Sequence, residues 1–317
     1  MNAAELSAHL DRYLALRRAL GFAMRAQERL LRDFVQFVSR QQGAFPLRAE
    51  IALQWACSTA NRCGPAGQAS RLSLARGFLG YLRALEPETQ VPPRHLLPGA
   101  HRPLPHIYSS EEIAALLAAA RELGPRESLR PHTMATIIGL VASCGLRAQE
   151  ALGLRLQDVD LEQRPSLLRI EQTKFRKSRV VVLHPSAATA LHTYAEQRRC
   201  LGYDGLCDFF FVSESAQRLS YRTVARTFVS LARQLGIRGP VGQRGAHLHD
   251  LRHTFAVTRL LRWYQEGADV RARLPELSVY LGHVQPQQTY WYLTATPALL
   301  DLAATRFEAF VAQGETP

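Results

Sequence analysis

Lysine is nearly absent from this basic chain of 317 residues: of its 39 lysines and arginines, only Lys174 and Lys177 are lysines. An arginine guanidinium does not give up a proton in proteins, whereas a lysine ammonium can act as a general acid. We attribute this strong preference for arginine over lysine to the coding composition of the source genome rather than to a physical requirement. The two remaining lysines are therefore candidates for chemistry that a guanidinium cannot perform.

Long apolar runs and ordered cysteines are also missing. No run of about 18 apolar residues could span a membrane, and the first residues lack the apolar core of a secretion signal. The cysteines are odd in number and lack the spacing of metal ligands, which predicts reduced thiols and no metal site. Together these absences predict a cytoplasmic protein with no cofactor and no membrane partner. They are Cys57, Cys63, Cys144, Cys200 and Cys207.

Positive charge is present along the whole chain. The formal net charge is +12, and residues 1–95 contribute 13 Arg against 7 acidic residues, or +6, so that the remainder also carries +6. Clustered cations bind a phosphate backbone by releasing its condensed counterions. Both halves are expected to contact nucleic acid, and a basic surface without a specific ligand is the alternative.

The pattern of apolar residues predicts two domains. Residues 1–95 show helical periodicity interrupted by Gly and Pro, which indicates three or four helices. A proline-rich linker follows at 96–108, and 109–317 form the second domain. Ser109 and Glu112 have the spacing of a capping box, so a helix is expected to begin there.

The second domain is expected to be mostly helical with one small antiparallel sheet. Alternating runs at 166–171 and 179–183 predict a hairpin with Lys174 and Lys177 at its tip, and 208–212 is a possible third strand. Helices are expected at about 186–200, 221–236, 249–266, 274–282, 286–293 and 297–313. The fold class is therefore mainly α with a small antiparallel β-sheet, in two domains.

Two arginines of this domain are candidates for holding a phosphate. Phosphodiester transfer builds negative charge on the non-bridging oxygens, and a planar guanidinium neutralises it with two parallel hydrogen bonds. Arg147 follows an apolar run, and Glu150 could orient it; a plain buried ion pair between the two is the alternative. Arg252 is the second candidate, with a surface cation as its alternative.

Histidines and a tyrosine complete the set. His249 lies three residues before Arg252, so on a helix the two share a face, and its imidazole can transfer protons near neutral pH unless it only caps the helix. The stretch HLHDLRH resembles the HxHxDH zinc motif, but Leu251 replaces the aspartate, so no metal is expected. His283 and the phenol of Tyr292 are the last candidates, although an aromatic cluster around Tyr292 is more often core.

The order of these motifs resembles the tyrosine recombinase family, the phage-integrase-like site-specific recombinases. The matching stretches are GLRAQE at Arg147, TKFRKSR at Lys174, HDLRH at His249 and Arg252, LGH at His283, and the nucleophile at Tyr292. The resemblance covers about residues 105–313. Residues 1–95 resemble the core-binding, DNA-clamping domain of the family in architecture only, and the surroundings of Tyr292 resemble a transposon-associated branch.

The resemblance implies a mechanism. Tyr292 attacks the scissile phosphate to form a 3′-phosphotyrosyl link, Lys174 protonates the leaving 5′ oxygen, and Lys177 is the other candidate for that role. Arg147 and Arg252 hold the phosphate, and His249 and His283 assist. Resealing needs neither ATP nor a metal, because the covalent intermediate stores the energy of the broken bond.

The resemblance also implies partners. These are double-stranded DNA with inverted half-sites and further copies of the chain, as a tetramer on synapsed DNA, with other recombinases as additional candidates. The final helix would dock on a neighbouring protomer or on its own domain, and the protein would act at the bacterial nucleoid. The alternatives are a type IB topoisomerase and a catalytically silent DNA-binding protein.

Overall fold

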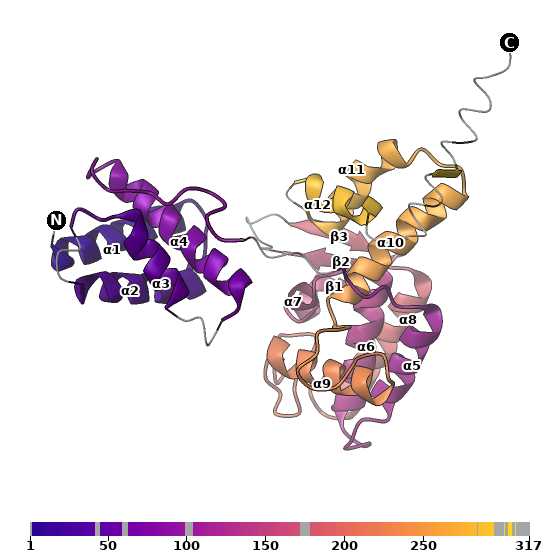
Figure 1. Cartoon of the computed structure of the whole chain (residues 1–317). Helices are drawn as coiled ribbons and strands as arrows, with labels where there is room; N and C mark the ends of the chain where they lie inside the picture. The colour runs from indigo at the N-terminus through magenta and orange to yellow at the C-terminus, as the bar shows by residue number, and fades with distance from the viewer. Residues whose placement is uncertain are drawn as a thin grey trace, which may run out of the picture. The chain divides into compact units, whose positions relative to one another are not determined.

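The computed structural model of the chain divides into two compact units, residues 1–103 and 104–317 (Figure 1). The described residues are 2–41, 45–58, 63–98, 104–171, 178–283 and 285–294, with four separate positions beyond them at 301, 304, 305 and 308. Lys174, Lys177 and most of the helix expected at 297–313 lie outside this part of the chain. No helix in the described residues combines the length and apolarity needed to cross a membrane.

The first unit contains four helices within its described residues. These are α1 (Ala3–Ala19), α2 (Arg25–Ser39), α3 (Ala49–Cys57) and α4 (Pro65–Arg83). The periodic leucines and aromatics of the sequence form one apolar core between them, with fully buried side chains such as Leu10, Phe34, Trp55 and Phe78. Proline at the first position of α4 and the Asn2–Glu5 capping box of α1 explain where two of the helices begin.

A buried arginine ties three of these helices together. The guanidinium of Arg71 lies 3.9 Å from the ring centroid of Trp55, and both side chains donate hydrogen bonds to Asp33, at 3.1 Å and 2.9 Å respectively. Arg71 also donates to the Trp55 carbonyl at 3.2 Å. A charge at this depth is tolerated because it is both paired and hydrogen-bonded.

The second unit is mainly helical with a small antiparallel sheet, which confirms the predicted fold class. Its helices are α5 (Ser110–Arg121), α6 (Leu129–Cys144), α7 (Ala148–Ala151), α8 (Pro185–Cys200), α9 (Tyr221–Gln234), α10 (Asp250–Gln265), α11 (Val270–Leu281) and α12 (Gln287–Tyr290). Two short 3-10 segments are η1 (Leu156–Asp158) and η2 (Trp291–Thr294). The capping box at Ser109 and Glu112 is present, so α5 begins where the sequence predicts.

The sheet has the order β1-β2-β3, with β1 (Val159–Asp160), β2 (Leu167–Ile170) and β3 (Arg179–Val182) all antiparallel. The predicted hairpin is β2 and β3, paired from Leu167 with Val182 to Ile170 with Arg179. The third strand expected at 208–212 is wrong, because that run makes only isolated bridges. Its residues 210–212 are buried one after another, as suits a core-filling segment rather than a strand with alternating faces.

Helix α6 lies at the centre of this unit and packs against α5, α8 and α10 (Figure 1). It is apolar on most of its surface, as expected of a helix enclosed by neighbours. Helix α11 begins at Val270 rather than at the predicted 274, because the Asp269 carboxylate accepts hydrogen bonds from two backbone amides and caps it there. The expected helix at 286–293 is split into α12 and η2.

Candidate active site

Two glycine turns bring the separated motifs of the second unit to one place. α6 ends at Gly145 with a φ of 61°, and α11 ends at Gly282 with a φ of 68°, both in the left-handed region that favours glycine. A Cβ on Gly145 would lie 2.5 Å from Phe255, and one on Gly282 would lie 2.6 Å from Arg179. Both turns therefore require glycine for backbone conformation and for space.

The two predicted arginines fasten these turns to each other. Arg252 on α10 donates to the carbonyl of Gly145 at 2.7 Å and to the carbonyl of Leu281 at 2.6 Å. Arg147, at the start of α7, donates to the carbonyl of Gly282 at 2.9 Å. Side chains from sequence positions more than a hundred residues apart thus converge, as the ordered motifs predict.

Arg252 is buried, with 1% of its surface exposed, so the alternative of a surface cation is wrong. Burial and the nearby positive charge of Arg147 lower the pKa of Arg252 to about 10, whereas an ionised Tyr292 opposes this shift. The guanidinium remains charged near neutral pH. Its hydrogen bonds to carbonyls use two of its five N–H donors.

Glu150 lies between two arginines. Its carboxylate accepts hydrogen bonds from Arg147 at 2.7 Å and from Arg179 at 3.1 Å and 2.7 Å. Burial alone would raise the pKa of Glu150, but the hydrogen bonds and charge of Arg179 and Arg147 lower it to about 2. The ion pair between Arg147 and Glu150 therefore exists. Arg147 forms it while also donating a hydrogen bond to the Gly282 turn.

Arg179, the first residue of β3, is a site residue that sequence reasoning missed. Besides Glu150 it bonds the carbonyl of Tyr280 at 2.8 Å, so it joins the sheet to α11. A buried carboxylate needs cationic partners, so a second arginine on Glu150 could be predicted only if the burial of Glu150 were known.

His249 occupies the position before α10, but its side chain makes no capping hydrogen bond. Burial, reinforced by the positive charge of Arg252, lowers the pKa of His249 to about 4. Its imidazole is therefore neutral near neutral pH and can accept a proton. The ring packs edge-on against His253 with centroids 4.8 Å apart.

Tyr292 in η2 is 1% exposed and belongs to the apolar cluster formed by α10, α11 and η2. Its hydroxyl lies 3.0 Å from Nδ1 of His253. Its ring also packs near those of His283 and Trp291, at centroid separations of 6.1 Å and 5.5 Å. The ring is thus core material, as the alternative held, while the hydroxyl contacts an imidazole.

His253 is the second missed residue. It is buried, and it follows His249 by four positions in HDLRH, so the two imidazoles share one face of the helix. That spacing is the signal in the sequence that could have identified it. His283, by contrast, was predicted, and its Nδ1 lies 2.7 Å from the Thr289 hydroxyl in α12.

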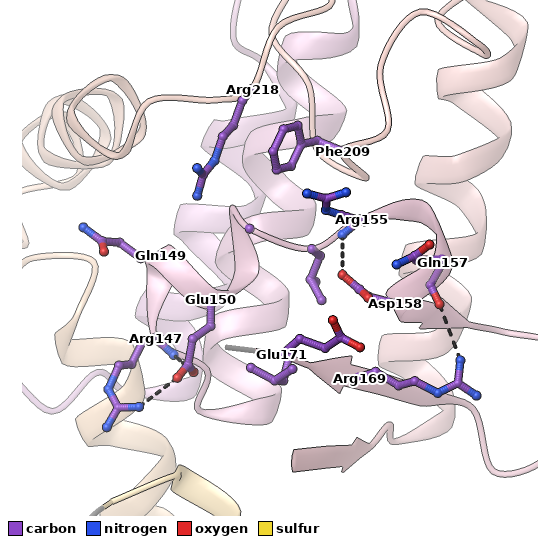
Figure 2. A pocket seen from close by; sticks show the side chains of 13 residues that line it. Arg147, Gln149, Glu150, Arg155, Gln157, Asp158, Arg169, Glu171, Phe209 and Arg218 are labelled. Atoms are coloured by element: carbon purple, nitrogen blue, oxygen red, sulfur yellow. Dashed lines mark hydrogen bonds and ion pairs between the residues drawn. The ribbon is translucent and has the colours of Figure 1, made fainter. Parts of the chain in front are cut away.

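A cavity of about 780 Å³ opens beside Arg147 and Glu150 (Figure 2). Ile170, the last residue of β2, and Glu171, which follows it, form part of its wall. Further arginines line it at positions 155, 169 and 218. Within the described residues, no group of three or more His, Cys, Asp or Glu side chains is placed to hold a metal ion.

Comparisons with known proteins agree with one another. The family model described as the Phage integrase family matches residues 107–298. "Putative integrase/recombinase y4rB" of Sinorhizobium fredii is 41% identical, covering 94% of this chain and 96% of that protein. "Tyrosine recombinase XerD" of Pseudomonas putida is 31% identical over 74% of this chain and 73% of its own.

Among solved structures, the Tn1549 transposon integrase in complex with transposon right end DNA has a TM-score of 0.67 at 15% identity, covering 98% of this chain and 100% of that chain. This likeness is one of fold.

Proposed function

We propose that this chain, which belongs to the phage integrase family and is a tyrosine recombinase, cleaves and rejoins DNA by attack of the Tyr292 hydroxyl on a backbone phosphate. The tyrosine recombinases among its relatives and a XerH site-specific recombinase of similar fold support site-specific recombination as its activity. Neither a type IB topoisomerase nor a catalytically silent DNA-binding protein is favoured by that membership.

The assignment of residues rests on one observation: each of the two arginines is hydrogen-bonded to a glycine turn that positions another site residue. Arg252 bonds the turn that precedes Arg147, and Arg147 bonds the turn that precedes His283. Guanidiniums fixed by carbonyls keep their direction while the phosphate gains charge, so they stabilise the transition state without reorganising. We therefore assign Arg147 and Arg252 to the scissile phosphate.

The proton of the attacking phenol needs an acceptor. Tyr292 contacts His253, and His249 lies edge-on to His253 with a pKa lowered to about 4. The His253 imidazole lies 3.0 Å from the hydroxyl in the resting position, close enough to take its proton as η2 moves toward the phosphate. We assign proton acceptance to this pair, with His253 in contact with the nucleophile and His249 beside it.

The remaining steps follow from balancing the reaction. The phenolic oxygen forms a bond to phosphorus, the bond from phosphorus to the 5′ oxygen breaks, and Lys174 gives that oxygen a proton. The product is a 3′-phosphotyrosyl link and a free 5′ hydroxyl, and attack by a 5′ hydroxyl of another strand reverses the sequence. His283 is assigned to the phosphate oxygens, and Glu150 to orienting Arg147.

Burial of Tyr292 adds a condition to this mechanism. Tyr292 and Arg252 are each 1% exposed and cannot meet a DNA phosphate as they lie, so η2 has to move before attack and uncover both side chains. The hydrogen bond to His253 then holds the phenol until that movement. Such a hold limits unprogrammed cleavage, because the nucleophile becomes available only when its short segment rearranges.

The finer partners are also proposals. We assign the unit of residues 1–103 to clamping the duplex, since its helical part carries as much net positive charge as the rest of the chain. We further propose inverted half-sites, a tetramer of this chain on synapsed DNA with other recombinases as possible members, and action at the nucleoid.

Recovery of covalent adducts tests the proposal without knowledge of the target site. Cells expressing the protein are lysed in denaturant, the protein is purified, and the DNA that stays attached is sequenced. Wild type and Tyr290→Phe, which changes an exposed tyrosine two positions away, should carry DNA joined to one site, and Tyr292→Phe should carry none. Adducts in Tyr292→Phe would reject the nucleophile, and their absence from wild type would support a silent binder.

A further inference from the structure

The cavity beside Arg147 contains a second pair of arginines on a rigid support (Figure 2). Arg155 forms an isolated bridge with Phe209, flanked by backbone hydrogen bonds of 2.9 Å from Leu156 to Asp208 and from Phe210 to Leu154. Arg218 forms a similar bridge with Val212. Backbone pairing therefore fixes the stems of both arginines to the same segment.

Phe209 positions the two guanidiniums. Their central carbons lie 5.9 Å (Arg155) and 5.0 Å (Arg218) from the centroid of its half-buried ring, within the range of a cation–π interaction. Figure 2 shows both guanidiniums beside this ring, with Arg147 and Glu150 on another side of the cavity. Contact with a ring face leaves the in-plane N–H donors of a guanidinium available.

The carboxylates of the cavity are engaged elsewhere. Glu150 binds Arg147 and Arg179, and Asp158 accepts a hydrogen bond from the backbone amide of Arg155 at 2.8 Å rather than from its side chain. Glu171 is exposed. Across the described residues, neither Arg155 nor Arg218 has a carboxylate oxygen within 4.0 Å of its guanidinium nitrogens.

We infer that Arg155 and Arg218, held against Phe209, bind a DNA backbone phosphate next to the one that Arg147 holds. Guanidiniums match phosphate geometry with parallel hydrogen bonds, and successive phosphates of one strand pass a surface at regular intervals. One cavity holds Arg147 and this pair, so a strand with its scissile phosphate at Arg147 presents a neighbouring phosphate to them. This inference rests on the proposed function. It implies that the two arginines hold the DNA strand in a fixed position relative to Arg147.

The salt dependence of DNA binding tests the inference without any cleavage. The probe is a short fluorescein-labelled duplex of arbitrary sequence, with anisotropy measured against protein concentration at several NaCl concentrations. Each phosphate contact contributes about 0.9 to the slope of log K against log[NaCl]. Arg155→Ala/Arg218→Ala should lower the slope by about 0.9, the value for one phosphate. With that change, the affinity ratio of wild type to variant shrinks about 3.5-fold over a fourfold rise in salt.

Three matched variants separate phosphate contact from general charge. Arg199→Ala removes an exposed arginine near the end of α8 and should leave the slope within about 0.3 of wild type. Arg155→Lys/Arg218→Lys keeps the charges and should retain most of the slope. Phe209→Leu should weaken binding while near-ultraviolet and far-ultraviolet circular dichroism stay native. A double-alanine slope no lower than that of Arg199→Ala overturns the inference, whatever the adduct experiment yields.

The position of the phosphate is tested on the site recovered from the adducts. Single methylphosphonates, which are neutral, replace each phosphate neighbouring the cleaved one. Wild type should lose affinity at one neighbouring position, and the double-alanine variant should lose nothing further there. Equal losses in both proteins would place the pair away from the cleaved strand and reject the assignment.

Discussion

Replacing Glu150 by glutamine should destabilise the unit of residues 104–317 by about 3 kcal/mol near neutral pH. The carboxylate is 9% exposed and pairs with Arg147 and Arg179, and the latter is itself 10% exposed. Glutamine keeps the shape and one acceptor oxygen but removes the charge. Arg179 then stays buried without an anion, which is the costly result of breaking a buried pair.

The magnitude follows from the pKa of Glu150. Its ordinary value of 4.5 falls to about 2 in the folded protein. A difference of one in pKa corresponds to about 1.4 kcal/mol, so the shift corresponds to about 3 kcal/mol. Because the folded value is the lower one, the stabilisation is complete above about 4.5 and is lost as the pH falls toward about 2.

Urea unfolding measures this effect in the correct unit. Trp55 is replaced by Phe in every sample, so that emission comes from Trp263 and Trp291, which both lie in residues 104–317. Glu122→Gln is the control, because its partner Arg126 is exposed and such pairs contribute less than about 1 kcal/mol. A Glu150→Gln loss no larger than that of the control would refute the reasoning, as would a loss that persists unchanged at acid pH.

Three further predictions concern the site. Gly282→Ala should lower stability by more than Gly236→Ala, because both glycines have positive φ but only Gly282 faces a side chain, that of Arg179. Thermal unfolding compares the two variants, and equal losses of stability would contradict the packing argument. The advantage of wild type over His249→Gln in single-turnover cleavage should persist as the pH falls past 6.5 and disappear toward about 4, where His249 takes up a proton; loss of that advantage centred at 6.5 would contradict this. Lys174→Ala should cleave slowly and recover on a substrate with a 5′-bridging sulfur, whereas Lys177→Ala should cleave normally; rescue of Lys177→Ala instead would exchange the two roles.

The fold class was predictable because its evidence is local. Helical periodicity, the Ser109 capping box and the alternating runs of the hairpin each depend on residues a few positions apart. The wrong prediction of a strand at 208–212 also comes from relying on local evidence. A short apolar run fits a strand or a core segment equally, and only the neighbours that bury it decide.

The proposed site rests instead on evidence that is spread along the chain. Arg147, His249, Arg252 and Tyr292 are recognised by the order of their motifs, and the structure brings their elements together. No motif marks Arg179, and His253 is marked only by its spacing of four residues from His249. Their importance arises from tertiary contacts, with a buried carboxylate in one case and with the phenol in the other.

Tyr292 shows why a packing interpretation and a catalytic one need not compete. Its ring fills a core between α10 and α11, and removing that ring from its neighbours costs the transfer free energy of an aromatic side chain. The same packing sets the resting position of the hydroxyl against His253. In the proposed mechanism, substrate contacts that move η2 must therefore supply enough free energy to offset both the apolar burial and the hydrogen bond. Contacts distant from the reacting phosphorus, including those proposed for Arg155 and Arg218, are the available source, since binding free energy from non-reacting groups can drive such a rearrangement.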